Sequence, residues 1–264
     1  MVAFGFAQHR PGEFAVMRTV GVDLAAQAKH TAVAVIEWGS GRARVVDIEI
    51  PADDDAVLRQ SAPADKVGID CPLGWPEPFV TFLCAHRVNA SQGPGDNRGG
   101  KGWRSLAYRR TDEHVRTSAG LVPLSVATDR IGLTAIRAAR LQALLAQRGH
   151  DVNRTGTGLI VEVYPAAGLK LWRLPHNRYK GRAHHEGLGA LVDALISAAP
   201  WLELADHERV CRLSDHAFDA VVAALLARAA ARGFTEMPAG TDRAAAAAEG
   251  WIALPSCALS DVVT

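Results

Sequence analysis

The stretches VGVDLA (residues 20–25) and VGIDCPLG (residues 67–74) carry the pattern from which the fold of this chain can be predicted. Each is an apolar run that ends in a Gly-apolar-Asp step, which is typical of a buried β-strand with a carboxylate at its end. A turn or helix cap explains Asp23 or Asp70 taken singly. In one sheet, however, the two strands would bring both carboxylates to the same edge, where ligands bind in open α/β sheets. Like charges held close together favour a compensating cation, so the pair predicts a metal site.

The sequence around these two stretches predicts the order of the sheet. Four apolar runs are interpreted as strands: residues 19–24, 31–38, 42–50 and 66–70. Gly39, Ser40 and Gly41 join the second and third runs, so these predict a hairpin. Asp53, Asp54 and Asp55 begin a short predicted helix, because acids suit the positive N-terminal end of a helix. The order strand, strand, strand, helix, strand argues against a simple alternation of strands and helices.

The rest of the chain is predicted to be mainly helical. Residues 76–130 are rich in Gly and Pro, which predicts an irregular, helical and Gly-rich insertion after the fourth strand. A short strand is expected at residues 159–164, and helices are expected at residues 131–150, 188–197 and 214–232. The predicted buried face of the first of these helices carries Ile136, Leu141, Leu144 and Leu145. The Ala-rich last helix, capped by Ser214, could be core or a dimer face, which leaves a homodimer open.

Composition favours a globular cytoplasmic protein. Of its 264 residues 48% are hydrophobic and 22% charged, which suits one elaborated domain over residues 19–264 after an N-terminal extension of residues 1–18. Met17 is an alternative start. No run approaches the roughly 20 apolar residues that span a bilayer, and the first residues lack a secretory signal pattern. The four cysteines form no CxxC pair, which argues against a zinc ribbon and against a disulfide framework.

The helix predicted from Ser214 supplies further acidic candidates. Asp215 and Asp219 are four residues apart, and His216 and Asp219 are three apart, so each pair can share one helical face. Capping explains Asp215 as well as a catalytic role does. Asp219 lies beyond the first turn in an apolar setting, which makes it the stronger candidate. Glu162, inside the apolar run LIVEVYP, is either a surface-facing residue of a half-exposed strand or a further site residue.

Basic residues are concentrated in two stretches, although the net charge is only +1. They outnumber acidic residues seven to three in residues 86–116 and five to one in residues 170–186. The candidates for binding a phosphate-bearing substrate are Arg109, Arg110, Asp112, Lys180 and Arg182. Arginine suits this role because it presents paired donors to phosphate oxygens. Solvated basic loops and an exposed helix start are the alternative interpretation.

Six motifs, in their order along residues 19–255, resemble the domain-of-unknown-function 429 family of predicted ribonuclease H-like nucleases. They are VGVDLA, GIDCPLGWP, RRTDEHVR, VEVYPA, DHAFDAVVAALLARA and GWIALP. The resemblance implies a ribonuclease H-like fold, a mixed five-stranded sheet flanked by helices, with an acidic cluster that binds Mg²⁺ or Mn²⁺. Such nucleases place acids in the first strand, at the end of the fourth and on the last helix, which Asp23, Asp70 and Asp219 match. The spacing of His216 and Asp219 is similar to that of two metal ligands in Holliday-junction resolvases, whereas the spacing of Asp215 and Asp219 is not.

The resemblance implies a metal-dependent nuclease that acts on DNA or RNA. Two divalent ions about 4 Å apart can activate a water and stabilise the leaving oxygen, and hard oxygen ligands select Mg²⁺ or Mn²⁺ over zinc. Two alternatives stay open. One is a nucleic-acid-binding or scaffold module of the same fold, which would tolerate dispersed acids. The other is an actin-like or sugar-kinase-like phosphotransferase, which would need a second domain and Gly-rich phosphate turns.

Overall fold

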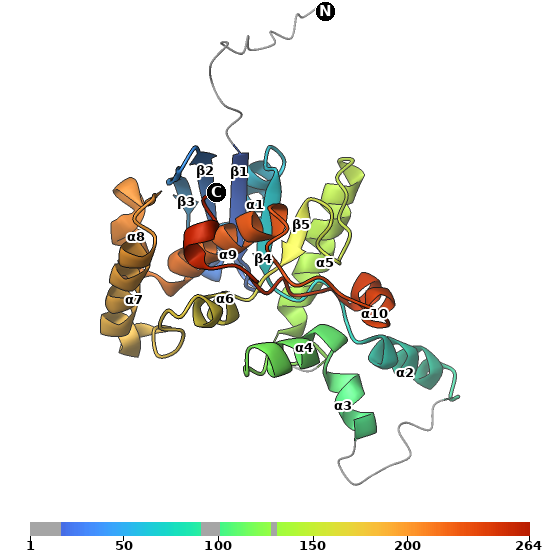
Figure 1. Cartoon of the computed structure of the whole chain (residues 1–264). Coiled ribbons are helices and arrows are strands. Elements are labelled where there is room, and N and C mark those ends of the chain that lie inside the picture. Colours follow the sequence, from blue (N-terminus) through green and yellow to red (C-terminus); the bar gives the residue numbers. More distant parts are fainter. Residues whose placement is uncertain (1–16, 91–100, 128–130) are drawn as a thin grey trace, which may run out of the picture.

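A six-stranded mixed sheet is the framework of the molecule (Figure 1). The computed structural model describes residues 17–90, 101–127 and 131–264. The strand order is β5-β4-β1-β2-β3-β6. The strands are β1 (Met17–Asp23), β2 (Ala32–Gly39), β3 (Arg42–Glu49), β4 (Lys66–Asp70), β5 (Ile160–Glu162) and β6 (Leu202–Glu203). β1, β2 and β3 are antiparallel, and the other neighbouring pairs are parallel.

The first four strands agree with the four apolar runs of the sequence. β2 and β3 form the predicted hairpin, and the Asp53 carboxylate caps α1 (Asp54–Ser61) by accepting a hydrogen bond from the Ala56 N–H at 2.8 Å. The predicted number of five strands was wrong, because β6 pairs with β3 at the edge of the sheet. A strand of two residues is too short to show a hydrophobic period, so the sequence pattern could not reveal it.

Helices cover both faces of the sheet (Figure 1). The helices that follow α1 along the described chain are α2 (Glu77–Arg87), α3 (Lys101–Ala107), α4 (Arg110–Ser118), α5 (Gly132–Gln147), α6 (Pro165–Leu171), α7 (His185–Ala198), α8 (Glu208–Leu213), α9 (Asp215–Ala231) and α10 (Asp242–Glu249). On one face of the sheet, α9 packs together with α6 and α7 in one hydrophobic core. α1 and α5 cover the opposite face. None of the helices in the described ranges has the length and apolar character needed to cross a membrane.

The insertion after β4 is helical in its described parts, in agreement with the predicted helical and Gly-rich insertion. Its described parts contain α2, α3 and α4 (teal to green in Figure 1). The Gly-rich residues 91–100 lie outside the described residues, as do residues 128–130 and nearly all of the predicted extension, residues 1–16. α5 confirms the next predicted helix, except that Ile136 is 59% exposed. The buried face of α5 follows Ala135, Ala138, Leu141 and Leu145, and Ile136 lies about 100° away from Ala135 around the helix.

α9 approaches the sheet closely because glycines face it. A Cβ at Gly21 of β1 would overlap the Ala220 carbonyl oxygen, and one at Gly68 of β4 would overlap that of Ala223. Residues 217–229 of α9 are all buried, as expected for a helix that is apolar on every side. The Ala-rich helix therefore belongs to the hydrophobic core, which was one of its two interpretations beside that of a dimer face. Its N-terminal turns consequently lie beside the ends of β1 and β4.

Gly21→Ala is expected to lower the free energy of unfolding by about 3 kcal/mol, because the added methyl must push α9 away from β1. The measurement is urea denaturation followed by circular dichroism. Gly39→Ala is the matched control, since a Cβ there would meet the Arg42 side chain at an ordinary contact distance of 3.6 Å. Equal denaturation midpoints for the two variants would contradict the close packing of α9 on β1.

Candidate metal centre

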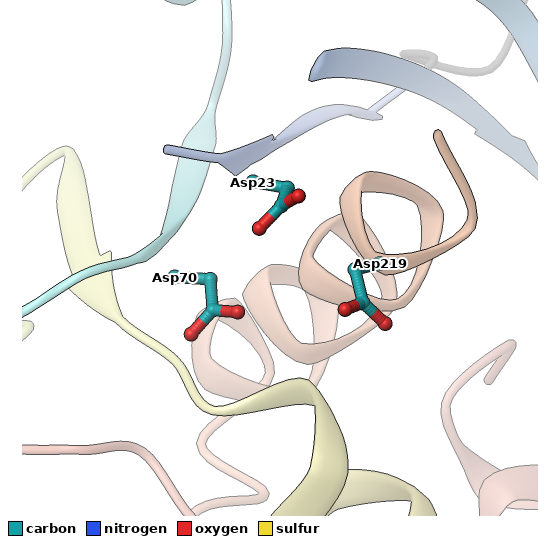
Figure 2. Close-up of side chains that lie close together, drawn as sticks. All are labelled: Asp23, Asp70 and Asp219. Atoms are coloured by element: carbon teal, nitrogen blue, oxygen red, sulfur yellow. The ribbon is translucent and has the colours of Figure 1, made fainter. Parts of the chain in front are cut away.

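Three aspartates from three elements converge at one end of the sheet (Figure 2). Asp23 ends β1, Asp70 ends β4, and the two residues are paired in the parallel register of these strands. Asp219 lies near the start of α9. One carboxylate oxygen of each residue can be chosen so that all three atoms lie within 4.8 Å of one another. The expected meeting of the acids from the first strand, the fourth strand and this helix is therefore observed.

Burial makes this cluster unfavourable without a cation. Asp219 is 1% exposed, Asp23 is 9% exposed, and Asp70 is partly buried. Burial raises the pKa of Asp70 well above its usual range; Lys180 opposes this shift, whereas Asp23 and Asp219 add to it. Burial also raises the pKa of Asp219 to about 6. A divalent cation would offset both the desolvation and the mutual repulsion, so the cluster could hold a metal ion.

Two of the three carboxylates already form hydrogen bonds or ion pairs with neighbouring side chains. The Asp219 Oδ1 accepts a hydrogen bond from the Tyr179 hydroxyl at 2.9 Å, and its Oδ2 lies 2.6 Å from the Lys180 Nζ. The Asp23 Oδ2 lies 2.6 Å from the His216 Nδ1. The Asp70 carboxylate accepts no hydrogen bond from any residue in the described parts of the chain. Its oxygens are therefore the ones most open to an ion.

The two other candidates on α9 serve the aspartates indirectly. His216 contacts Asp23, and this hydrogen bond raises the pKa of the imidazole. The group of potential ligands found among the described residues consists of the three aspartates, without His216. Asp215 accepts a hydrogen bond from the Gly181 N–H at 2.9 Å. Asp215 therefore holds the loop that carries Lys180, and this contact favours an anchoring role over a catalytic one.

Glu162 belongs to a buried ion-pair network beside the acids. Its two oxygens accept hydrogen bonds from Arg109 Nη1 and Nη2 at 2.8 and 2.7 Å, and Oε2 also accepts one from the Leu73 N–H at 3.0 Å. The interpretation of Glu162 as a surface-facing strand residue was wrong, because it is 2% exposed. Arg109 also donates to Asp112 Oδ1 at 2.9 Å. Burial disfavours the charge of Arg109, but Glu162 and Asp112 raise its pKa overall.

The candidate phosphate-binding residues lie in different surroundings. The guanidinium of Arg109 is engaged by Glu162 and Asp112, and Lys180 is engaged by Asp219. The side chain of Arg110 is 60% exposed and pairs with Asp242 at 2.8 Å. The Arg182 side chain lies outside the described residues. Phosphate binding by Arg110 and Arg182 stays a prediction.

A cavity of about 620 Å³ opens beside the cluster, and Asp23 and Asp70 line it. Charged residues of its wall include Asp23, Asp70, Arg109, Glu162, Arg178 and Lys180. Apolar and aromatic residues of its wall include Leu124, Ile131, Tyr164 and Tyr179. Sequence reasoning missed Tyr179 and missed the contact between Lys180 and Asp219, because no spacing connects the loop before α7 with α9. The density of basic residues around Lys180 was the available signal.

Comparison with known proteins gives one result. The family described as "Protein of unknown function (DUF429)" matches residues 21–243 of the chain. No curated protein and no solved structure matches. The matched range contains all three aspartates of the cluster. The comparison therefore covers the candidate site and assigns no activity to it.

Proposed function

The chain belongs to the DUF429 family of proteins of unknown function, and from that premise we propose that it is a divalent-metal-dependent nuclease with a ribonuclease H-like fold. The observation that carries the proposal is the convergence of Asp23, Asp70 and Asp219 beside a cavity. The acids stand in the first strand, at the end of the fourth strand and on the helix packed across the sheet. The resemblance of the sequence to predicted nucleases of this fold implies the same three positions.

The donor set fits Mg²⁺ or Mn²⁺. Carboxylate oxygens are hard ligands, and these two ions prefer them. Cys71 follows Asp70 and lines the cavity, but its thiol donates to the Pro72 carbonyl oxygen and is not part of the group of potential ligands found among the described residues. The ligands of that group are all carboxylate oxygens, without a soft ligand that would favour zinc. When bound, a divalent ion would polarise the phosphodiester and lower the pKa of the attacking water.

The residues around the acids suit a nucleic-acid substrate. The cavity volume of about 620 Å³ falls in the range of sites that enclose a small ligand, so one nucleotide unit would fit. Arg178 and Lys180 bring positive charge to the wall of this cavity, where phosphate oxygens would lie. Tyr164 offers an aromatic ring from the same wall, a suitable surface for stacking a base. His216 would orient Asp23 through their hydrogen bond.

The test is a cleavage assay on single-stranded and double-stranded DNA and RNA. Metal-free protein is incubated with each substrate in the presence of Mn²⁺ or of a chelator. We expect cleavage only with the metal, and Asp23→Asn should lower its rate by about 10³-fold, because loss of the ion removes several kcal/mol of transition-state stabilisation. Asp55→Asn, an exposed residue of α1, is the control and should cleave like the wild type.

Two results would count against the proposal. Full activity of Asp23→Asn would remove that aspartate from the mechanism. Nucleic-acid binding without cleavage of any substrate, by a wild type that binds Mn²⁺, would favour the binding-module alternative.

A further inference from the structure

Lys180 brings a cation of the chain itself into the acidic cluster. Its ammonium lies 2.6 Å from Asp219 Oδ2, and it lines the same cavity as Asp23 and Asp70. The Lys180 side chain is 52% exposed, so the ammonium contacts Asp219 and also faces solvent. When all four groups are ionised, three carboxylates and one ammonium carry a net charge of about two negative units. A single divalent ion would neutralise that charge.

α9 holds the loop on both sides of Lys180. Before it, Tyr179 is buried, donates to Asp219 Oδ1 at 2.9 Å and packs edge-on against Phe218 with ring centroids 6.2 Å apart. After it, the Gly181 N–H donates to Asp215 Oδ2 at 2.9 Å. Fixing the neighbouring residues reduces the conformational entropy that Lys180 loses when it binds Asp219. The position of the ammonium is therefore set by the fold as well as by attraction between charges.

We propose that Lys180 is the second cation of this site, so that the acidic cluster binds a single divalent ion where the sequence predicted two. The inference rests on the proposed function, because it concerns the same metal site. Both oxygens of Asp219 already accept donors, and Asp23 Oδ2 faces His216. A second ion within about 4 Å of the ammonium would meet strong repulsion in this partly desolvated site. A neutral His216 adds no charge, and a protonated one would repel a second ion further.

Lys180 can contact the substrate at the place where a second metal ion would otherwise do so. An ammonium on the wall of the cavity can donate hydrogen bonds to a phosphate oxygen while it stays close to the carboxylates. Such a fixed charge stabilises the negative charge that develops in the transition state. Lys180 would then serve substrate binding, as its sequence context predicts, from within the metal cluster.

The test is calorimetric titration of Mn²⁺ into the metal-free full-length protein. Wild type is compared with Lys180→Met, which removes the charge, and with Lys180→Arg, which keeps it. Lys170→Met, on α6 and outside the cavity lining, is the matched control. We expect a single bound ion in the wild type, in Lys180→Arg and in the control, and a second saturable ion in Lys180→Met. Circular dichroism checks the fold, and Lys180→Gln replaces the Met variant if that one fails to fold.

The possible failures are distinguishable. A wild type that binds two ions, or a folded charge-removing variant that still binds one, would overturn the role of Lys180 and leave the metal site standing. Absence of Mn²⁺ binding in all the proteins would overturn the metal site, and with it both the proposed function and this inference.

Discussion

Asp70→Asn is expected to abolish saturable Mn²⁺ binding and, in the same molecule, to make the metal-free protein more stable. The first effect follows because Asp70 supplies the carboxylate of the cluster that accepts no hydrogen bond from the described residues. The second follows because Asn has nearly the same shape without the charge. Burial and the charges of Asp23 and Asp219 disfavour the ionised form of Asp70. Removing the negative charge of Asp70 therefore lowers the electrostatic repulsion within the acidic cluster.

The sign of the pH dependence follows from the raised pKa values. A carboxyl whose pKa is higher in the folded than in the unfolded state binds protons more tightly in the folded state. Its contribution to stability therefore decreases as the pH rises from the unfolded-state pKa to the folded-state pKa. For Asp219 that window runs from about 4 in the unfolded chain to about 6 in the folded one. The pKa of Asp70 is shifted in the same direction. The stabilising effect of Asp70→Asn should therefore be large at pH 8 and small at pH 4.

Thermal unfolding in a chelator measures this effect. We expect a gain of about 1–3 kcal/mol at pH 8, which corresponds to a rise in melting temperature of about 2–4 °C per kcal/mol for a chain of this size. Mn²⁺ should raise the melting temperature of the wild type and leave that of Asp70→Asn unchanged, because only an ion that binds the folded state stabilises it. Asp55→Asn should behave as wild type in both respects. A lower melting temperature for Asp70→Asn, or undiminished Mn²⁺ affinity, would contradict the assignment.

Arg109→Ala is expected to cause the largest loss of stability among the variants considered, about 3–5 kcal/mol, because it leaves buried carboxylates without their partner. Arg109 and Asp112 are each 1% exposed and Glu162 is 2% exposed at the side chain. Arg109 also donates to the Glu249 carbonyl oxygen at 3.1 Å. The side chain thus connects α4 of the insertion with β5 and α10, and its loss should loosen all three. Urea denaturation measures the change.

Arg110→Ala is the matched control, since Arg110 is the next residue and pairs with Asp242 at the surface. Exposed ion pairs contribute about 0–1 kcal/mol, so this variant should unfold close to the wild type. Combining Arg109→Ala with Glu162→Gln should cost less than the sum of the single changes, because the second change removes a buried charge that the first left unpaired. Equal destabilisation by Arg109→Ala and Arg110→Ala would show that the buried network does not hold the insertion.

Local sequence reasoning succeeded where a pattern repeats along the chain. The four N-terminal strands, their hairpin and the α9 helix follow from the spacing of apolar residues and from caps such as Asp53 and Ser214. It failed at β6, whose two residues show no period, and at Ile136, which is exposed although Leu141 and Leu145 of the same predicted face are buried. Helical periodicity alone leaves the rotation of a helix open when its apolar residues extend around it.

The sheet that carries Asp23 and Asp70 and the helix that carries Asp219 could be predicted from the sequence, because each acid ends or interrupts an apolar run whose period is visible in a few residues. The partners of these acids follow from the packing of elements that lie far apart along the chain. Tyr179 reaches Asp219 across 40 residues of chain, and Arg109 reaches Glu162 across 53. Such contacts form when whole elements pack together, and no local period in the chain encodes the distance between elements. The same packing brings Lys180 to the acidic cluster, so the number of cations that the site accepts is a property of the folded protein.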